Sequence, residues 1–253
     1  MDEQENCPLY MKPLTDSLES ELLAEETSEM TQNPFLADGF WYGHIRDAWG
    51  YMRSYDVLCF RDGSDADCLV MQDGLVLGWM KGQLSIGSQE PEPDVSVAFD
   101  VHVPDLPDAI ASTSGLARML TSAASFEAKL DYERYVLFLK HSMGNGIDTP
   151  SHPLASVYTY ANVNGETSSL AIDEDGSLFA QTESGCIYSG AINGREIELT
   201  VANCGEANGQ YTGLALHAFP FYVRPPQGLI PNSMVAFAAY GNGRYITGYG
   251  LIP

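Results

Sequence analysis

The chain has 253 residues, of which 34 are acidic and 12 are basic, so its net charge at pH 7 is -22. A field of that sign repels phosphate backbones and anionic lipid surfaces, so the composition argues against a nucleic-acid partner. Because 45% of the residues are hydrophobic and Gly and Tyr are abundant, we expect a folded protein rich in strands and turns.

Residues 1–38 are acidic and lack strand patterning, and we treat them as an N-terminal tail. The stretch "TDSLESELLAEETSEM" has capping-box spacing at Asp16 and Glu19. It predicts either a short helix that docks on the body or on a partner, or a mobile acidic tether. The opening "MDEQENCPLY" has neither a basic start nor an apolar stretch. If the protein is exported, we expect that its signal has been removed or replaced by Met1.

Residues 39–148 contain short alternating runs separated by Gly, Asp and Pro, a pattern that predicts a first β domain. The expected strands are "FWYGHI", "YDVLCF", "DCLVMQ", "LVLGWMKGQLSI", "VSVAFDVHV" and "SFEAKLDY". Two stretches stay open: residues 109–124 fit a short helix or a strand pair, and residues 133–153 form a connection that starts as a helical turn or a strand. The domain boundary is expected near residues 144–153.

Residues 149–253 form a more regular second β domain. Eight strands are expected, namely "SVYTYA", "SSLAID", "SLFAQT", "CIYSGAI", "EIELTV", "QYTGLALHA", "MVAFAAY" and "RYITGYGL". Eight strands joined by hairpin turns predict an all-β, antiparallel up-and-down meander that can close as a barrel. The runs at residues 55–86 and 168–197 share the order of strands and Gly turns, so the two halves are interpreted as a diverged repeat.

Four of the five cysteines form two symmetric pairs. Cys59 and Cys68 are equidistant from the middle of "FRDGSDAD", and Cys186 and Cys204 are equidistant from Arg195. Opposed residues of an antiparallel hairpin lie close enough for an S–S bond, so we predict disulfides Cys59–Cys68 and Cys186–Cys204, and hence an oxidising compartment. A four-Cys metal site is the rival, but no short C-x2-C spacing is present.

Cys7 remains outside both pairs. It lies near the start, just before the tether-like region, where a lipid-modified N-terminal cysteine would be found. The residues before it are not a lipobox, so a free thiol or an intermolecular disulfide stay as alternatives.

A longer pattern runs from Leu170 to Leu216: Ile-Asp-x-Asp-Gly, then Gly-Cys-x-Tyr-x-Gly, Leu-Thr-Val-x-x-Cys-Gly and Asn-Gly-x-Tyr-x-Gly-Leu-Ala. With these motifs the chain resembles a group of proteobacterial exported proteins, mostly lipoproteins of unknown function. The likeness is loose before Leu170, where "GFWYGHI" resembles the Gly-x-Trp-x-Gly opening strand of that group. The resemblance implies an exported β-protein and carries over no catalytic residue.

No nucleophile elbow and no His-x-x-x-His spacing occurs in the chain, and we expect no enzyme. The loop with Asp62, Asp65 and Asp67 offers oxygen ligands that suit Ca²⁺, although a solvated acidic turn explains the loop as well. No other cofactor is expected. Aromatic residues beside Gly predict either barrel core packing or a ligand groove. The residues considered for that groove are Trp41, Trp49, Trp79, Tyr188 and Tyr211.

These patterns predict an exported, disulfide-stapled β-protein that acts as a non-catalytic binding or assembly subunit at the bacterial cell envelope. Its location would be periplasmic, attached to the outer membrane or extracellular, with a membrane contact only through a lipid on Cys7. Its partner would be another envelope or surface protein, in a homo- or hetero-assembly through the N-terminal arm. The alternatives are a small-ligand or glycan-binding barrel, comparable to lipocalins and avidins, and an acidic inhibitor or immunity-type protein.

Overall fold

The structure is a computed structural model. It describes residues 38–47, 54–87, 93–120, 123–131, 134–142, 155–162, 167–218 and 233–252. The chain divides into two units, Met1–Asn33 and Pro34–Pro253, and all described residues belong to the second unit. The expected N-terminal helix or tether, and Cys7 and Trp49, lie outside the described residues.

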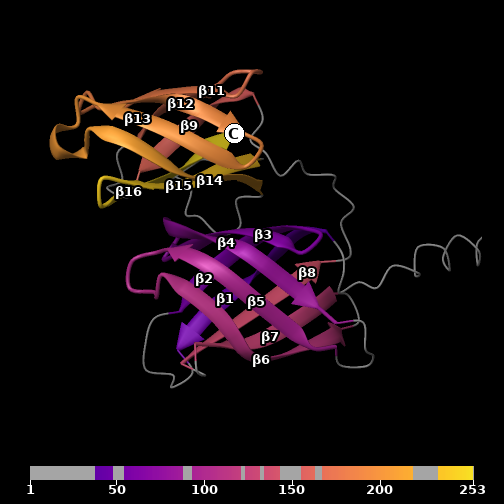
Figure 1. Ribbon diagram of the computed structural model, residues 1–253. Coiled ribbons are helices and arrows are strands. Elements are labelled where there is room, and N and C mark those ends of the chain that lie inside the picture. Colours follow the sequence, from indigo (N-terminus) through magenta and orange to yellow (C-terminus); the bar gives the residue numbers. More distant parts are fainter. Residues whose placement is uncertain are drawn as a thin grey trace, which may run out of the picture. The chain divides into compact units, whose positions relative to one another are not determined.

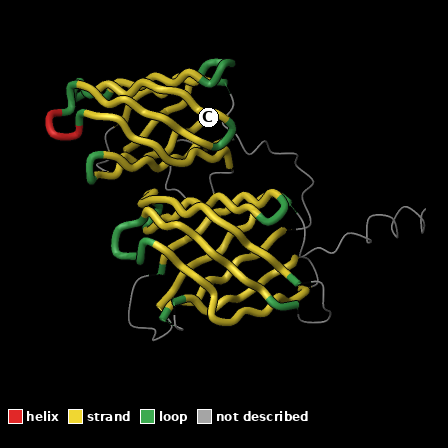
Figure 2. The backbone as a smooth tube through the Cα atoms, in the orientation of Figure 1, coloured by secondary structure: helices red, strands yellow, loops and turns green. Residues whose placement is uncertain are grey.

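Strands β1 to β8 form a closed antiparallel barrel in chain order (Figures 1 and 2). The last strand pairs with the first, with Trp41 opposite His141 and Ile45 opposite Leu137. The strands of this first barrel are β1 (Gly39–Asp47), β2 (Tyr55–Asp62), β3 (Asp65–Gln72), β4 (Leu75–Ile86), β5 (Val95–His102), β6 (Ala109–Leu120), β7 (Ala123–Leu130) and β8 (Tyr135–Ser142).

Strands β9 to β16 form a second closed antiparallel barrel, in which β9 pairs with both β10 and β16. Its strands are β9 (Ser156–Asn162), β10 (Thr167–Ile172), β11 (Ser177–Gln181), β12 (Ile187–Asn193), β13 (Glu196–Ala202), β14 (Gly209–Ala218), β15 (Ser233–Gly241) and β16 (Arg244–Ile252). The predicted all-β antiparallel meander is thus confirmed. Both stretches that the sequence leaves open, residues 109–124 and 133–153, contain strands, β6 and β8.

Tight turns with the expected chemistry join several of these strands. Asp73 and Gly74 connect β3 to β4 with φ angles of 52° and 79°, and Asn242 and Gly243 connect β15 to β16 with 52° and 72°. Two-residue turns with positive φ at both positions match the right-handed twist of a hairpin and favour Asn, Asp and Gly. The turn residues therefore set the register of β15–β16, and that of β3–β4 next to its turn, up to a register shift between Val70 and Met71.

Alternating side chains fill the interior of each barrel. In the first barrel Trp41, Phe126 and Met80 are among a contiguous cluster of buried residues contributed by all eight strands. In the second, Tyr158, Tyr211 and Phe237 belong to an equivalent cluster. The hydrophobic burial on which each barrel depends therefore lies along its own axis.

A third apolar cluster lies on the outside of the strands and joins residues of both barrels. Its members are Leu58, Leu69, Met71 and Val76 from β2 to β4, and Leu214, Leu216, Met234, Ala236, Ala238 and Tyr249 from β14 to β16. Strand β4 contacts β15 and β16, and β3 contacts β14 and β15. These strands are thus buried on both faces, which explains their nearly continuous apolar runs.

The described part of the chain contains one short 3-10 turn, Gly205–Ala207, between β13 and β14 (Figure 2).

Among the described residues there is no helix of the length and hydrophobicity needed to cross a membrane.

Candidate functional site

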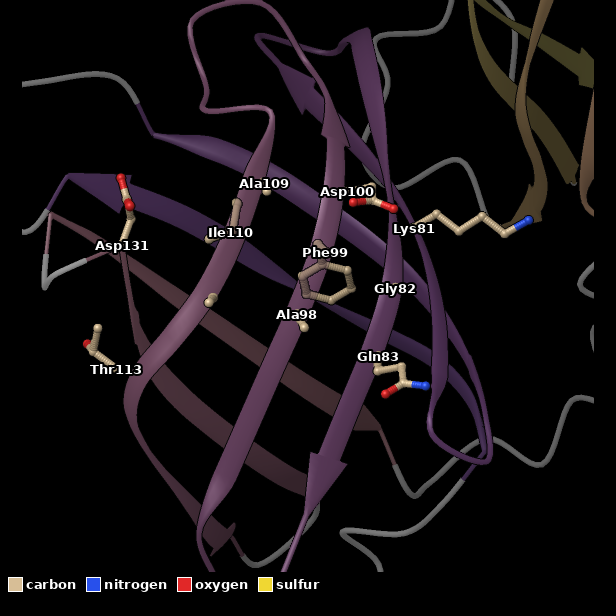
Figure 3. Close-up of a pocket in the computed structure, with 11 residues that line it drawn as sticks. Lys81, Gly82, Gln83, Ala98, Phe99, Asp100, Ala109, Ile110, Thr113 and Asp131 are labelled. Atoms are coloured by element: carbon tan, nitrogen blue, oxygen red, sulfur yellow. The ribbon is translucent and has the colours of Figure 1, made fainter.

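A groove follows the outer face of the first barrel over strands β4, β5 and β6 (Figure 3). It consists of two adjoining cavities of about 670 and 590 Å³. Both cavities are lined by Lys81, Gly82, Gln83 and Asp100, so they lie next to each other along strand β4. We call this groove the alanine groove, because of the residues that form its floor.

Three exposed alanines on β5 and β6 form the apolar floor of the groove and make the groove shallow. Ala98 pairs with Ala111, and Asp100 pairs with Ala109, while Phe99 and Ile110 between them point into the barrel core. Methyl side chains at three of four neighbouring outward positions leave the sheet face uncovered. The hollow therefore follows directly from small residues at outward positions of two paired strands.

The rim of the alanine groove carries carboxylates at both ends. Asp131 and Thr113 lie at one end, and Asp100 and Lys81 lie at the other (Figure 3). The second cavity adds Asp65 together with residues of the β12–β13 turn. Among the described residues, no ion pair joins a cation to Asp65, Asp100 or Asp131.

The β12–β13 turn closes one end of the groove through Arg195. Its Nε donates a 2.6 Å hydrogen bond to Oδ2 of Asp67 on β3, and its guanidinium lies 4.8 Å from the ring centre of Phe60. Only 9% of the Asp67 side chain and 22% of the Arg195 side chain are exposed. Charge-assisted bonds of this kind are stronger than neutral ones, so Arg195 fixes the turn against the first barrel.

The neighbouring Glu196 forms a second ion pair, with Lys81. The side-chain hydrogen bond from Lys81 holds the pKa of Glu196 below its usual range, and the same bond raises the pKa of Lys81. The Lys81 ammonium is thereby committed to Glu196, and Asp65, Asp100 and Asp131 set the charge of the groove.

An array of rings extends the contact between the barrels. Trp79 lies 4.1 Å from His102, His102 lies 5.5 Å from Tyr240, and Tyr240 lies 4.8 Å from Tyr245, measured between ring centres. The indole Nε1 of Trp79 is buried and has no hydrogen-bond partner in the described structure. The array adds aromatic contacts to the apolar cluster between the barrels.

The five residues considered for a ligand groove are not brought together. Trp41 packs in the core of the first barrel, while Tyr188 and Tyr211 pack in the core of the second. Trp79 points outward and packs against the cluster between the barrels. Trp49 lies outside the described residues. The described members of this set therefore contribute to the packing of the barrel cores and of the cluster between the barrels.

The three aspartates considered for Ca²⁺ occupy the β2–β3 hairpin. Asp62 and Asp65 face each other beside the turn and are exposed, whereas Asp67 binds Arg195. Within the described residues, no group of three or more His, Cys, Asp and Glu side chains is placed to hold a metal ion.

Both disulfides are present in the structure. Cys59 and Cys68 face each other directly in the β2–β3 ladder and lie in the core of the first barrel. Cys186 and Cys204 flank the β12–β13 hairpin and pack at the edge of the second core. The β12–β13 hairpin has a two-residue turn, Gly194-Arg195, so its ladder is centred between these two residues and not on Arg195, from which the two cysteines are equidistant.

The one-residue offset is instead absorbed beside Cys204. Asn203 would face Cys186 if the ladder continued, but it adopts a φ of 60° and turns the chain so that Cys204 meets Cys186. Asn tolerates the left-handed region better than most residues.

Two disulfides are typical of proteins that fold in an oxidising compartment.

The alanine groove and the Arg195–Asp67 pair cannot be recognised from the sequence. The pair joins residues 128 positions apart, and no local pattern links them. A signal for the surface between the barrels does exist, since "CLVM" at 68–71 and "MVAFAA" at 234–239 are apolar without alternation. Such runs indicate strands that are buried on both faces.

No protein-family model, no curated protein and no solved structure matches this chain.

Proposed function

We propose that this chain is a non-catalytic binding or assembly protein of the bacterial cell envelope or surface, which holds another protein on the outer faces of its barrels. The observation that carries the proposal is the filling of both barrel interiors by apolar side chains. Recognition then falls to the outer surface, where the alanine groove lies.

The two disulfides support an exported location, periplasmic, outer-membrane-attached or extracellular. Thiols are kept reduced in most cytosols, whereas envelope and secreted proteins retain such bonds. The resemblance of residues 170–216 to proteobacterial exported proteins points the same way. In this proposal Cys7 is the site of a lipid or of an intermolecular disulfide, and the acidic arm of residues 1–38 reaches the partner.

The charge of the chain favours one version of this function. A net charge of -22 steers a basic partner to the surface and disfavours acidic ones. An acidic inhibitor or immunity-type protein, which covers a basic site on its target, is therefore the form of binding that we favour over a carrier of small ligands or glycans. A carrier would need space in a barrel axis that Trp41, Tyr158 and Tyr211 occupy.

The proposal is tested with the full protein in its native host. Cell fractionation, followed by alkylation and mass spectrometry, should place it in the envelope or outside the cell with Cys59, Cys68, Cys186 and Cys204 oxidised. Crosslinking in intact cells should yield a defined envelope or surface protein that binds again after both are purified. A cytosolic location with reduced cysteines, or the failure of any crosslinked protein to bind when purified, would overturn the proposal.

A further inference from the structure

We infer that the alanine groove is the binding site for an extended peptide segment of a partner, with basic side chains that meet Asp65, Asp100 and Asp131. This inference rests on the proposed binding function and deepens it, by naming the surface and the chemistry of the segment.

The shape of the groove suits a peptide in extended conformation. Ala98, Ala109 and Ala111 present only methyl groups to solvent, so a peptide backbone can approach the sheet face closely. The two cavities of about 670 and 590 Å³ each fall within the size range of ligand clefts. The alanine methyls provide an apolar surface for the aliphatic parts of Lys and Arg side chains, which cover apolar area while their charged ends stay in water.

Polar side chains line the edges where a main chain would need hydrogen bonds. Gln83 and Thr113 are exposed on strands β4 and β6 at the groove, and Asn193 lies at the β12–β13 end. The Gln83 and Asn193 amides can both donate and accept, and the Thr113 hydroxyl, which donates to the Lys129 carbonyl, can still accept; these groups suit the alternating N–H and C=O groups of an extended chain.

The charges of the groove select basic segments. Lys81 is engaged with Glu196 and Arg195 with Asp67, so the two cations of the lining are already balanced within the protein. Asp65, Asp100 and Asp131 add negative charge along the groove. An acidic segment or a nucleic-acid backbone would meet repulsion from these carboxylates and from the chain as a whole.

The test uses the purified full chain and a fluorescent peptide of alternating Lys and Ala. A length of about twelve residues spans roughly 40 Å when extended. Binding is followed by fluorescence anisotropy, with an alternating Glu-Ala peptide as the charge control and spermidine as a competitor. We expect the Lys-Ala peptide to bind, the Glu-Ala peptide not to bind, and spermidine to compete poorly. If spermidine competes as well as unlabelled peptide, the site takes small polycations and the inference of a peptide is wrong.

Variants separate the groove from general charge attraction. Ala111→Trp fills the floor and should weaken peptide binding by about tenfold, equivalent to about 1.4 kcal/mol. Ala109→Trp serves as a second filling variant if the first is unstable. The matched control is Thr212→Trp, at an exposed position of β14 in the second barrel, and should leave binding unchanged.

Charge variants complete the test. Asp65→Asn combined with Asp100→Asn should weaken binding and reduce its salt dependence, whereas Asp173→Asn combined with Glu198→Gln, at exposed positions of the second barrel, should not. Equal losses in both double variants, or full binding by both filling variants, would overturn the assignment of the groove. A crosslinked envelope partner that binds Ala111→Trp normally would refute the groove while leaving the proposed function intact.

Discussion

Arg195 is the residue at which the two barrels are most specifically joined. Its side chain binds Asp67 and lies over Phe60, and its carbonyl oxygen accepts a 2.8 Å hydrogen bond from the Ala215 amide. The first two contacts reach the first barrel, and the third ties the turn back to its own barrel. Removing Arg195 therefore leaves the exposed Lys81–Glu196 pair as the other ion pair between the barrels among the described residues.

Replacing Arg195 by Met should lower the free energy of unfolding by about 2 kcal/mol, since the nearly buried Asp67 carboxylate loses its partner. Urea denaturation measures the loss. The matched control is Arg244→Met, which breaks an exposed pair with Glu206 and should cost less than about 1 kcal/mol.

The double variant Asp67→Leu/Arg195→Met tests the cause of that loss. A buried ion pair replaced on both sides by apolar residues is often close to neutral, so most of the stability should return. If the double variant is as unstable as Arg195→Met alone, lost packing on Phe60 explains the effect and the charge argument is wrong.

The pairing of Arg195 with Asp67 cannot be predicted from a local sequence pattern. The acidic loop between β2 and β3 suggests Asp67 as a Ca²⁺ ligand, and that loop is a local feature of the sequence. The actual partner of Asp67 is set by how two barrels dock, which no short window of sequence contains. Cys59 and Cys68, in contrast, are predictable, because a two-residue turn alone makes them face each other.

Strand β6 shows where the alternation of side chains along a strand fails to predict which of them face the core. Ile110 and Ala117 both face the barrel core, although their positions differ by seven, which in a regular strand would put them on opposite faces. The register of β6 against β7 shifts between Ser112 and Ser114, so Thr113 is an extra residue of a β-bulge, which reverses the inward parity. The apolar spacing of residues 109–124 therefore matches neither a regular strand nor a helix.

The two disulfide-bridged hairpins should differ in their response to reductant. Cys59 and Cys68 are 1% and 0% exposed, whereas Cys186 and Cys204 are partly exposed. Attack by an external thiolate requires access to the sulfur. In native protein at low reductant, alkylation and mass spectrometry should therefore detect Cys186 and Cys204 first, and Cys59 and Cys68 only as the barrel unfolds.

Urea-unfolded protein is the control, because both bonds are then accessible and should be reduced at similar rates. Each cross-link closes a short loop, and its loss should lower stability by about 3 kcal/mol on chain-entropy grounds. Equal labelling of all four cysteines in the native protein would contradict this order.

For the whole molecule, the apolar cluster between the barrels predicts one cooperative unfolding transition. Each barrel has its own core, yet Leu69, Met71, Leu214 and Leu216 would be exposed to water if either barrel unfolded alone. Trp79 packs against the cluster between the barrels, so hydrogen exchange in β6 to β8 is used to report on the first barrel. Hydrogen exchange in β10 to β13 reports on the second, and both probes should give the same urea midpoint.

Leu216→Asp should separate the two midpoints, because it places a charge in the contact surface while leaving the core of the second barrel intact. Thr212→Asp, an exposed position of the same strand, should leave them coincident. Two separate midpoints in the unmodified protein would mean that the barrels fold independently.

The pairing of the first and last strand in each barrel has a mechanical consequence. The start of β1 lies opposite the end of β8, with Trp41 in register with His141, and the middle of β9 lies opposite the end of β16, with Thr159 in register with Leu251. Tension applied through the chain on either side of a barrel would thus act on one end of an antiparallel ladder and peel its hydrogen bonds open one after another. Each disulfide holds the two ends of a segment together, residues 59–68 in the first barrel and 186–204 in the second, so these segments would not extend under tension. Each disulfide therefore shortens the distance over which its barrel can be drawn out.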